Sequence, residues 1–317
     1  MMFLLTVTFM LSGISVLAVE NPVRTMKYSS RSEHDATIWQ KELRSKLSYL
    51  LKIDDLQANS KSIPLNPRVI VSEDKGSYIL QEIEFNSTSN RRIIVILTLP
   101  AKSKGLSPAV ICIHGHGGKG TSVYDTASIY KGFAAELASR NYVTIAPVVS
   151  QHEIYEKDRM LIGERLWDLI RCVDYLESLT MVNKNRIGCA GLSLGGEMAM
   201  WLSAMDTRVQ VTVSSGFLTN MDQMEQNHCM CWKFAGLRDL VDWADIYSLI
   251  APRYLQCQNG MKEPSTDFTV ALALEAMKSI KIIYGDFMKP ENVSLDVHEG
   301  GHEVDLQPLL SFFDKCL

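Results

Sequence analysis

From Pro100 onward, short segments rich in β-branched residues alternate with amphipathic helical segments, and this alternation constrains the fold more than any other feature. The segments that we expect to be strands are 109–113, 142–146, 186–190, 209–214, 253–256 and 293–297. The segments that we expect to be helices are 130–139, 160–179, 195–205, 268–280 and 303–316. Strands that alternate with helices predict an α/β fold, in which a mostly parallel central sheet has helices on both faces.

The chain before Pro100 follows a different pattern. Apolar residues recur at three- and four-residue spacings over 38–51, which predicts one helix. The segments 69–71, 77–85 and 92–99 predict an antiparallel meander of strands. We interpret 19–66 as an N-terminal arm with one helix and 67–317 as the main domain. Within that domain, 218–249 departs from the alternation and is rich in Met and Trp, so we expect a cap insertion there.

The first eighteen residues form an uncharged apolar segment that ends at Val16-Leu17-Ala18. Its length and its small-residue end predict a cleaved signal peptide over 1–18 and therefore export to the periplasm or the medium. A membrane anchor and a wrongly assigned start are the alternatives, because no Lys or Arg stands before the apolar residues. No second long apolar run follows, so we expect no stable membrane insertion after cleavage.

Composition excludes several classes of protein. The 317 residues are 46% hydrophobic and 21% charged, which argues against a disordered chain. The net charge is −4 and no long run of like charges occurs, so we expect no nucleic-acid partner. Seven Cys are too few for a disulfide scaffold, and their odd number leaves at least one unpaired within a single chain. The pairing of the cysteines and the oligomeric state stay open.

The strongest chemical signal is the motif Gly191-Leu192-Ser193-Leu194-Gly195. It follows an expected buried strand and precedes an expected helix, and a strand–turn–helix context is what a nucleophile elbow requires. The strained turn raises a serine Oγ above the sheet, and glycines are needed where side chains would collide with the neighbouring strand and helix. Ser193 is therefore the candidate nucleophile.

A serine nucleophile needs a base and a group that orients the base. His302 lies in the loop after the last expected strand, whereas His298 belongs to that strand, so we favour His302 as the base. The acid should follow the preceding strand, where Glu263 and Asp267 both occur. We favour Glu263, since Asp267 has the position of a helix cap or first-turn acid.

An acyl-transfer site also needs N–H groups that face the developing oxyanion. The backbone N–H of Leu194 is one candidate donor, and the backbone N–H of His116, in the glycine-rich segment 113–118, is the second. His114 and His116 lack a nearby third ligand in the sequence, so we expect no metal at this loop.

Other groups carry weaker signals. His228-Cys229-Met230-Cys231 places one imidazole and two thiols together, but no second Cys/His pair follows. We therefore expect a wall of the cap or a local disulfide here, without a metal. Arg165 is a weak candidate for binding a substrate carboxylate, and Trp232 is a weak candidate for substrate contact, although both residue types are more often part of the packing.

From about Ala109 to its end, the chain resembles the α/β-hydrolase superfamily, and within it the dienelactone-hydrolase-like and acetyl-xylan-esterase-like serine esterases. The matching segments are 113–118, Trp167-Asp168 with 174–176, 191–196, 249–253 and 300–303. The resemblance implies ester hydrolysis through an acyl-enzyme, with Ser193 as nucleophile and His302 as base. Dienelactone hydrolases proper have Cys where this chain has Ser193, and the usual acid is Asp where this chain has Glu263.

The sequence therefore predicts an exported serine esterase that hydrolyses carboxylic esters, with acetyl or a similar small acyl group on carbohydrate as the expected substrate. No cofactor is expected. A serine peptidase of the prolyl-oligopeptidase type is one alternative, although 19–108 is too short for the large domain that precedes the hydrolase in those enzymes. A non-catalytic binding protein on a hydrolase scaffold is the other.

Overall fold

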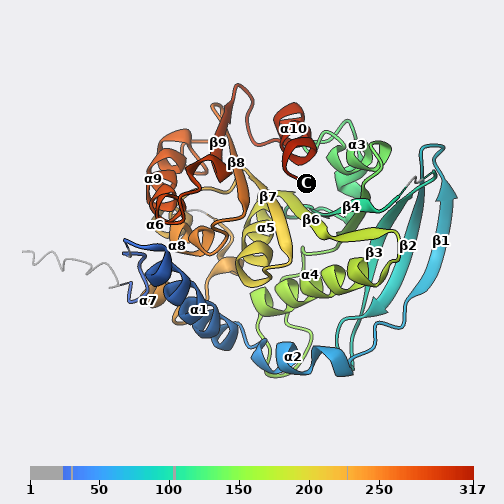
Figure 1. Cartoon of the computed structure of the whole chain (residues 1–317), viewed down its shortest axis with the longest axis horizontal. Helices are drawn as coiled ribbons and strands as arrows, with labels where there is room; N and C mark the ends of the chain where they lie inside the picture. Colours follow the sequence, from blue (N-terminus) through green and yellow to red (C-terminus); the bar gives the residue numbers. More distant parts are fainter. Residues whose placement is uncertain (1–23, 30, 103–104, 227) are drawn as a thin grey trace, which may run out of the picture.

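An open nine-stranded sheet forms the centre of the protein, with the strand order β1-β2-β3-β5-β4-β6-β7-β8-β9 (Figure 1). The computed structural model describes residues 24–29, 31–102, 105–226 and 228–317. The strands are β1 Arg68–Asp74, β2 Tyr78–Asn86, β3 Arg92–Pro100, β4 Ser107–Ile113, β5 Val143–Pro147, β6 Val182–Leu192, β7 Val209–Ser215, β8 Tyr254–Gly260 and β9 Val293–His298. Each contains or overlaps a strand expected from the sequence.

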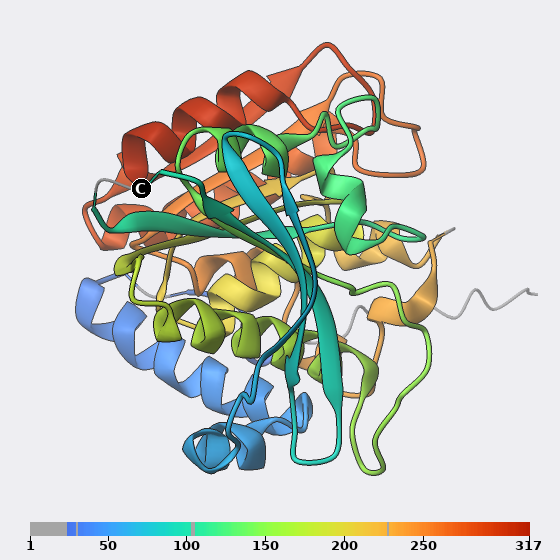
Figure 2. The same ribbon diagram turned by 90° about the vertical axis from the view of Figure 1, so that its right-hand side faces the viewer.

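The type of strand pairing changes once across the sheet, from antiparallel to parallel at β5. Strands β5, β4, β6, β7, β8 and β9 pair in parallel, whereas β1, β2 and β3 add to the β5 edge as an antiparallel meander. Figure 2 shows this meander in front of the parallel strands. The predicted mostly parallel α/β sheet is confirmed. Because β4 lies between β5 and β6, the chain reverses its direction of travel across the sheet there, and ligands of open α/β sheets bind at such a point.

Helices cover both faces of the sheet, as predicted, and form two apolar cores. The smaller core contains residues of α3 Phe133–Ser139 and α10 Leu306–Cys316. The larger core contains residues of α4 Leu161–Ser178, α5 Leu194–Met205 and α9 Val270–Asp286. The helices α3 and α4 therefore connect β4 to β5 and β5 to β6 on opposite faces. Among the described residues, no helix is long and apolar enough to cross a bilayer.

The N-terminal segment packs into the larger core. Helix α1 Glu33–Leu50 begins after Ser32, whose Oγ accepts a hydrogen bond from the Asp35 N–H at 3.1 Å. Its residues Leu43 and Leu47 are fully buried. The Gln40 amide donates to the backbone oxygens of Ser248 at 3.0 Å and Ala251 at 2.7 Å. The segment thus shares the core of the main domain.

More than the one expected helix lies in this segment. A short helix α2 Asp54–Asn59 and a 3₁₀ turn Ser60–Ser62 follow α1. Both are too short to show helical periodicity in a sequence. The predicted signal peptide, residues 1–18, lies outside the described residues, so export stays a prediction.

The expected insertion at 218–249 consists of short helical pieces between β7 and β8. They are α6 Met221–Met224, Met230–Trp232, α7 Leu237–Leu240 and α8 Trp243–Ser248. Trp243 anchors this segment, since its ring packs at centroid distances of 5.3 Å from Trp232, 5.2 Å from Phe217 and 6.4 Å from Trp201. Its Met and Trp side chains therefore serve mainly as packing.

Replacing Leu43 by Ala tests whether α1 is integral to the fold. The buried side chain leaves a cavity, so we expect the free energy of unfolding in urea to fall by about 2–5 kcal/mol. Ile38→Ala on the same helix is the control, because Ile38 is 52% exposed. That change should cost less than about 1 kcal/mol. Equal losses for the two variants would contradict the packing of α1 in the core.

Candidate active site

Ser193 occupies a sharp turn between β6 and α5. Its backbone has φ 62° and ψ −125°, a strained conformation for a residue with a side chain. A Cβ at Gly191 would lie 2.2 Å from the Gly195 carbonyl oxygen, and one at Gly195 would lie 2.2 Å from that of Ile113. Ser193 is half-buried, whereas the other residues of 191–200 are buried. The expected collision with the neighbouring helix and strand is confirmed.

The loop after β4 lies directly beside Ser193. A Cβ at Gly115 would be 3.1 Å from the Ser193 Cβ. The Gly118 N–H donates to the Gly115 oxygen at 3.2 Å, and Gly117 has φ 67°, so 115–118 is a tight turn that needs glycine at its third position. Neither His116 N–H nor Leu194 N–H donates to another described residue. Both candidate oxyanion donors thus adjoin residues of this region, Leu194 next to Ser193 and His116 next to Gly115, and their N–H groups have no hydrogen-bond partner among the described residues.

Hydrogen bonds made by His114 and Tyr130 hold this loop in position. The Gly115 N–H donates to the Tyr130 hydroxyl at 2.7 Å. The His114 ring is buried, with Nδ1 2.8 Å from the Gly115 oxygen and Nε2 accepting from the Val149 N–H at 3.2 Å. These partners fit a neutral ring with its proton on Nδ1, and burial lowers the pKa of His114 in the same sense. His114 therefore holds the loop in place.

His302 lies in the loop after β9 and meets Glu263 from the loop after β8. Its Nδ1 is 3.0 Å from both carboxylate oxygens of Glu263. The Glu263 side chain is 1% exposed, and the His302 side chain is 31% exposed. A Cβ at Gly216 would lie 3.0 Å from His302 Cε1, and the preceding Ser215 accepts the Ser193 N–H at 2.9 Å. Ser193 and His302 are therefore next to the same end of β7.

Backbone hydrogen bonds fix the two loops relative to each other. The Met261 N–H donates to the His298 oxygen at 2.8 Å, and the Lys262 N–H donates to the Gly300 oxygen at 2.9 Å. His298 is the last residue of β9, as expected for a strand residue. These bonds extend the β8–β9 pairing beyond the sheet and bring Glu263 opposite His302.

Gln258 is a positioning residue that the sequence pattern did not reveal. It is fully buried at the end of β8, and its Oε1 accepts from Ser215 Oγ at 2.7 Å and from the Asp305 N–H at 3.2 Å. Its Nε2 donates to the Asp305 oxygen at 3.0 Å. One amide thus joins the end of β7 to the loop that carries His302.

Asp267, the other candidate acid, faces elsewhere. Its Oδ1 lies 3.4 Å from His228 Nε2 and accepts from the Thr266 hydroxyl at 3.0 Å. The Phe268 ring stands between the two imidazoles, 5.1 Å from His228 and 5.6 Å from His302. Of the two carboxylates, only that of Glu263 contacts His302 within the described chain.

Part of the chain is similar in sequence to a family of peptidases and to a protein named as a hydrolase. The model of the prolyl oligopeptidase family (Peptidase_S9) matches residues 151–244, which include the Ser193 turn. YtaP of Bacillus subtilis (strain 168), named as a hydrolase, is 27% identical over 60% of this chain and 72% of its own length.

Solved structures extend the likeness to most of the chain. A protein of Bacteroides fragilis NCTC 9343, named as an acetyl xylan esterase, superposes with a TM-score of 0.71 and 18% identity, covering 87% of this chain and 78% of its own. Glucuronoyl esterase from Solibacter usitatus gives a TM-score of 0.63 and 17% identity, covering 79% of this chain and 86% of its own. The chain has the α/β-hydrolase fold.

The segments 167–168 and 174–176 that carried part of the α/β-hydrolase resemblance have structural roles. Arg91, in the β2–β3 turn, binds both oxygens of Asp168 at 2.7 Å. The Trp167 indole N–H donates to the Ser87 oxygen of the same turn at 2.9 Å. These contacts fasten the antiparallel meander to α4. Asp174 accepts from Arg208 at 2.8 Å, which links α4 to the start of β7.

Arg165 and Trp232, the weak candidates for substrate binding, are both buried. Arg165 is 0% exposed and donates to the Gln151 oxygen, with Nη1 3.6 Å from Cys231 Sγ. Trp232 is 1% exposed. Both side chains are enclosed by neighbouring residues and do not reach the surface. This burial gives no support to a contact with substrate, which stays a prediction.

The cysteines are all free, and all seven lie in the described chain. Cys112, Cys189 and Cys257 are buried in strands β4, β6 and β8, as expected for small apolar side chains. The local disulfide considered for 229–231 is absent, since Cys229 and Cys231 are both thiols.

Residues of the two His/Cys groups come together in the structure, which their separation along the sequence did not indicate. The structure brings His116 of the first group and Cys229 and Cys231 of the second to one place, together with His152. His152 had not been singled out, because no other His or Cys lies near it in the sequence. The spacing of residues along the chain could not predict this cluster, because its members come from loops that are distant in sequence.

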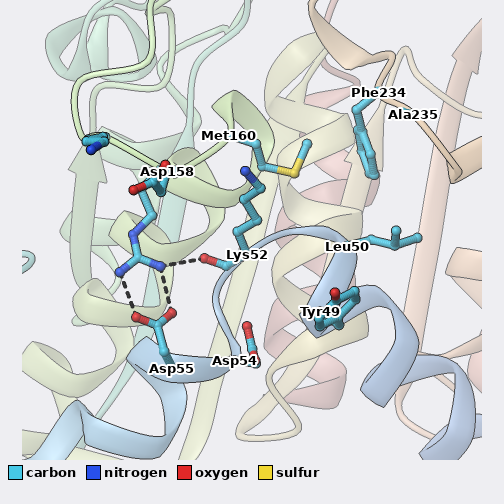
Figure 3. A pocket seen from close by; sticks show the side chains of 11 residues that line it. Tyr49, Leu50, Lys52, Asp54, Asp55, Asp158, Met160, Phe234 and Ala235 are labelled. Atoms are coloured by element: carbon cyan, nitrogen blue, oxygen red, sulfur yellow. Dashed lines mark hydrogen bonds and ion pairs between the residues drawn. The ribbon is translucent and has the colours of Figure 1, made fainter.

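A cavity of about 730 Å³ opens between the end of α1 and the start of α4 (Figure 3). Tyr49, Met160 and Phe234 are among its lining residues. At its side, Arg159 binds the Asp55 carboxylate with contacts of 2.6 and 2.8 Å. The candidate residues Ser193, Glu263 and His302 do not line it.

Glu197 gives a pH-dependent test of the buried region behind Ser193. Burial raises the pKa of Glu197 from 4.5 to about 7, with Arg165 opposing the shift. The folded state therefore keeps the proton that the unfolded state releases, and Glu197 lowers stability as pH rises from about 4.5 to about 7. An amide at this position does not titrate in this range.

We expect the difference in free energy of unfolding between Glu197→Gln and the parent protein to grow in favour of the variant by about 2–3 kcal/mol as the pH rises from roughly 5 to 8. Urea unfolding at the two pH values measures this difference. The same substitution at Glu275, whose side chain is 70% exposed, is the control and should show almost no change with pH. A pH-independent difference for the Glu197 variant would contradict the assignment.

Proposed function

We propose that this protein is a serine esterase that hydrolyses carboxylic esters, with Ser193, His302 and Glu263 as its triad. The observation that carries the proposal is the convergence at the carboxyl ends of the strands. Ser193 occupies a strained turn beside Gly115, and the imidazole that contacts Glu263 lies over Gly216. A nucleophile, a base and an orienting carboxylate in this order along the chain fit acyl transfer in an α/β-hydrolase.

Each group has a role in the proposed reaction. Ser193 Oγ attacks the ester carbonyl carbon, and His302 Nε2 takes the serine proton. The N–H groups of Leu194 and His116 bind the oxyanion. His302 returns the proton to the leaving alcohol and then activates a water that hydrolyses the acyl-enzyme. Glu263 holds the Nδ1–H and stabilises the charged ring.

The substrate that we propose is an ester of a carbohydrate, with acetyl or another small acyl group. Two kinds of support exist: the superposed proteins are named as an acetyl xylan esterase and a glucuronoyl esterase. The net charge of −4 suits a neutral ester better than a polyanion. Purified protein tested on acetylated xylan, acetylated monosaccharides, methyl glucuronate esters and aryl esters would identify the acyl group and the alcohol.

Ser193→Ala tests the nucleophile. Removal of the Oγ leaves no atom for the acyl-enzyme, so turnover of p-nitrophenyl acetate should fall by at least about 10⁴-fold. The thermal unfolding midpoint should stay close to that of the parent, and a fluorophosphonate probe should label the parent but not the variant. Retained turnover with an intact fold would overturn the mechanism.

Glu263→Gln compared with Asp267→Asn tests the acid. Both changes turn a carboxylate into an amide in the same loop, but only Glu263 contacts His302. An amide favours the wrong tautomer of the base, so kcat should fall by roughly 10³- to 10⁴-fold for Glu263→Gln. Asp267→Asn should stay near the parent. A large loss from the Asp267 variant alone would reverse the choice of acid.

A serine peptidase of the prolyl-oligopeptidase type is the second candidate, and the family match over 151–244 is the observation that favours it. Against it, the described residues before β4 form α1, α2 and three antiparallel strands, with no propeller among them. Hydrolysis of an aminoacyl-prolyl anilide together with inactivity on all esters would favour the peptidase. Failure of the fluorophosphonate probe to label the parent protein would instead revive a non-catalytic binding role.

A further inference from the structure

Four side chains from three loops converge beside the candidate oxyanion loop. They are His116 after β4, His152 before α4, and Cys229 and Cys231 from the 218–249 insertion, and their ligand atoms all lie within 4.8 Å of one another. His116 Nε2 is 3.2 Å from Cys231 Sγ, and His152 Nε2 is 3.4 Å from Cys229 Sγ. Each histidine thus already contacts one of the two thiols.

These distances approach those of a tetrahedral metal centre. Zinc–sulfur bonds of about 2.3 Å and zinc–nitrogen bonds of about 2.0–2.1 Å separate the ligand atoms of a tetrahedron by roughly 3.3–3.8 Å. Of the two N–S contacts, the one at 3.4 Å lies at the lower end of that range and the one at 3.2 Å lies just below it. The remaining pairs, at no more than 4.8 Å, need a contraction of only about 1 Å to reach it.

The donor set selects the kind of metal. Two thiolates and two imidazoles suit zinc, whereas magnesium and calcium prefer oxygen ligands. Two thiolates also balance the charge of one divalent zinc ion, and binding releases the two thiol protons to solvent. The uncharged result is compatible with the Arg165 guanidinium, whose Nη1 lies 3.6 Å from Cys231 Sγ and donates toward it.

Contacts outside the cluster orient its ligands. His152 Nδ1 lies 3.0 Å from the Ser150 oxygen, so a proton on Nδ1 is held there and Nε2 is left with a lone pair that faces Cys229. Metal-binding histidines are commonly held by such a carbonyl partner. His228, although adjacent to Cys229, contacts Asp267 instead and is not part of the cluster.

We propose that His116, His152, Cys229 and Cys231 form a structural zinc site. Its four protein ligands leave no open position for substrate, so the metal takes no part in the ester chemistry. It joins the 218–249 insertion to the loop whose His116 N–H is a candidate oxyanion donor. The evidence for the metal site does not depend on the proposed esterase activity.

Cobalt binding to the full-length protein, reduced with a phosphine and freed of metal, tests the site. We expect one cobalt ion per chain, with the intense visible bands of tetrahedral cobalt and near-ultraviolet thiolate-to-cobalt charge transfer. Zinc should displace the cobalt with loss of both signals. The Cys229→Ser/Cys231→Ser double variant should lose both signals, as should His116→Ala/His152→Ala.

Three variants serve as controls that must keep the signals. His228→Ala changes the histidine next to the cluster, and Cys316→Ser changes a thiol on α10 far along the chain. Ser193→Ala separates this proposal from the esterase, since an inactive protein should bind cobalt unchanged. A weak octahedral spectrum, no binding by the reduced protein, or full signals in the double cysteine variant would each overturn the zinc site.

Discussion

The close approach of α5 to strands β4 and β6 is the constraint on which the rest of the candidate site depends. Carbonyl oxygens lie so near Gly191 and Gly195 that a single methyl group fits at neither position. The chain can pass from β6 to α5 only through a tight turn, and Ser193 takes its positive φ as a result. The strain at that serine is balanced by the packing of a helix that is buried along its whole length.

The other half of the candidate site depends on pairing that continues beyond the sheet. Strands β8 and β9 end at the same level, and their loops go on pairing through the N–H groups of Met261 and Lys262. Gln258 connects these loops to the end of β7. Backbone and amide hydrogen bonds therefore set where Glu263 and His302 meet, and the two side chains add one contact between loops that are already fixed.

The sequence predicted what depends on local pattern. Alternating strand and helix segments gave the parallel sheet, and glycines around Ser193 gave the close approach, because each signal lies within a few neighbouring residues. Glu263 and Asp267 could not be separated with the same certainty, since they share one loop and only the pairing with the β9 loop decides which faces His302. Gln258 and the His116–His152–Cys229–Cys231 cluster have no local pattern, because their partners come from distant loops.

The loop after β4 is where these separate constraints meet. Tyr130 holds the Gly115 N–H from below, and the His114 ring fixes the loop to Val149. The next residue, His116, carries the N–H that we propose as an oxyanion donor, and its side chain lies beside Cys231. A loop that carries an oxyanion donor must be rigid before substrate binds, because reorganisation during the reaction would weaken the stabilisation of charge. The contacts of His114, Gly115 and His116 hold three consecutive residues of the loop in place and meet that requirement. The proposed zinc site would make the contact at His116 the strongest of the three.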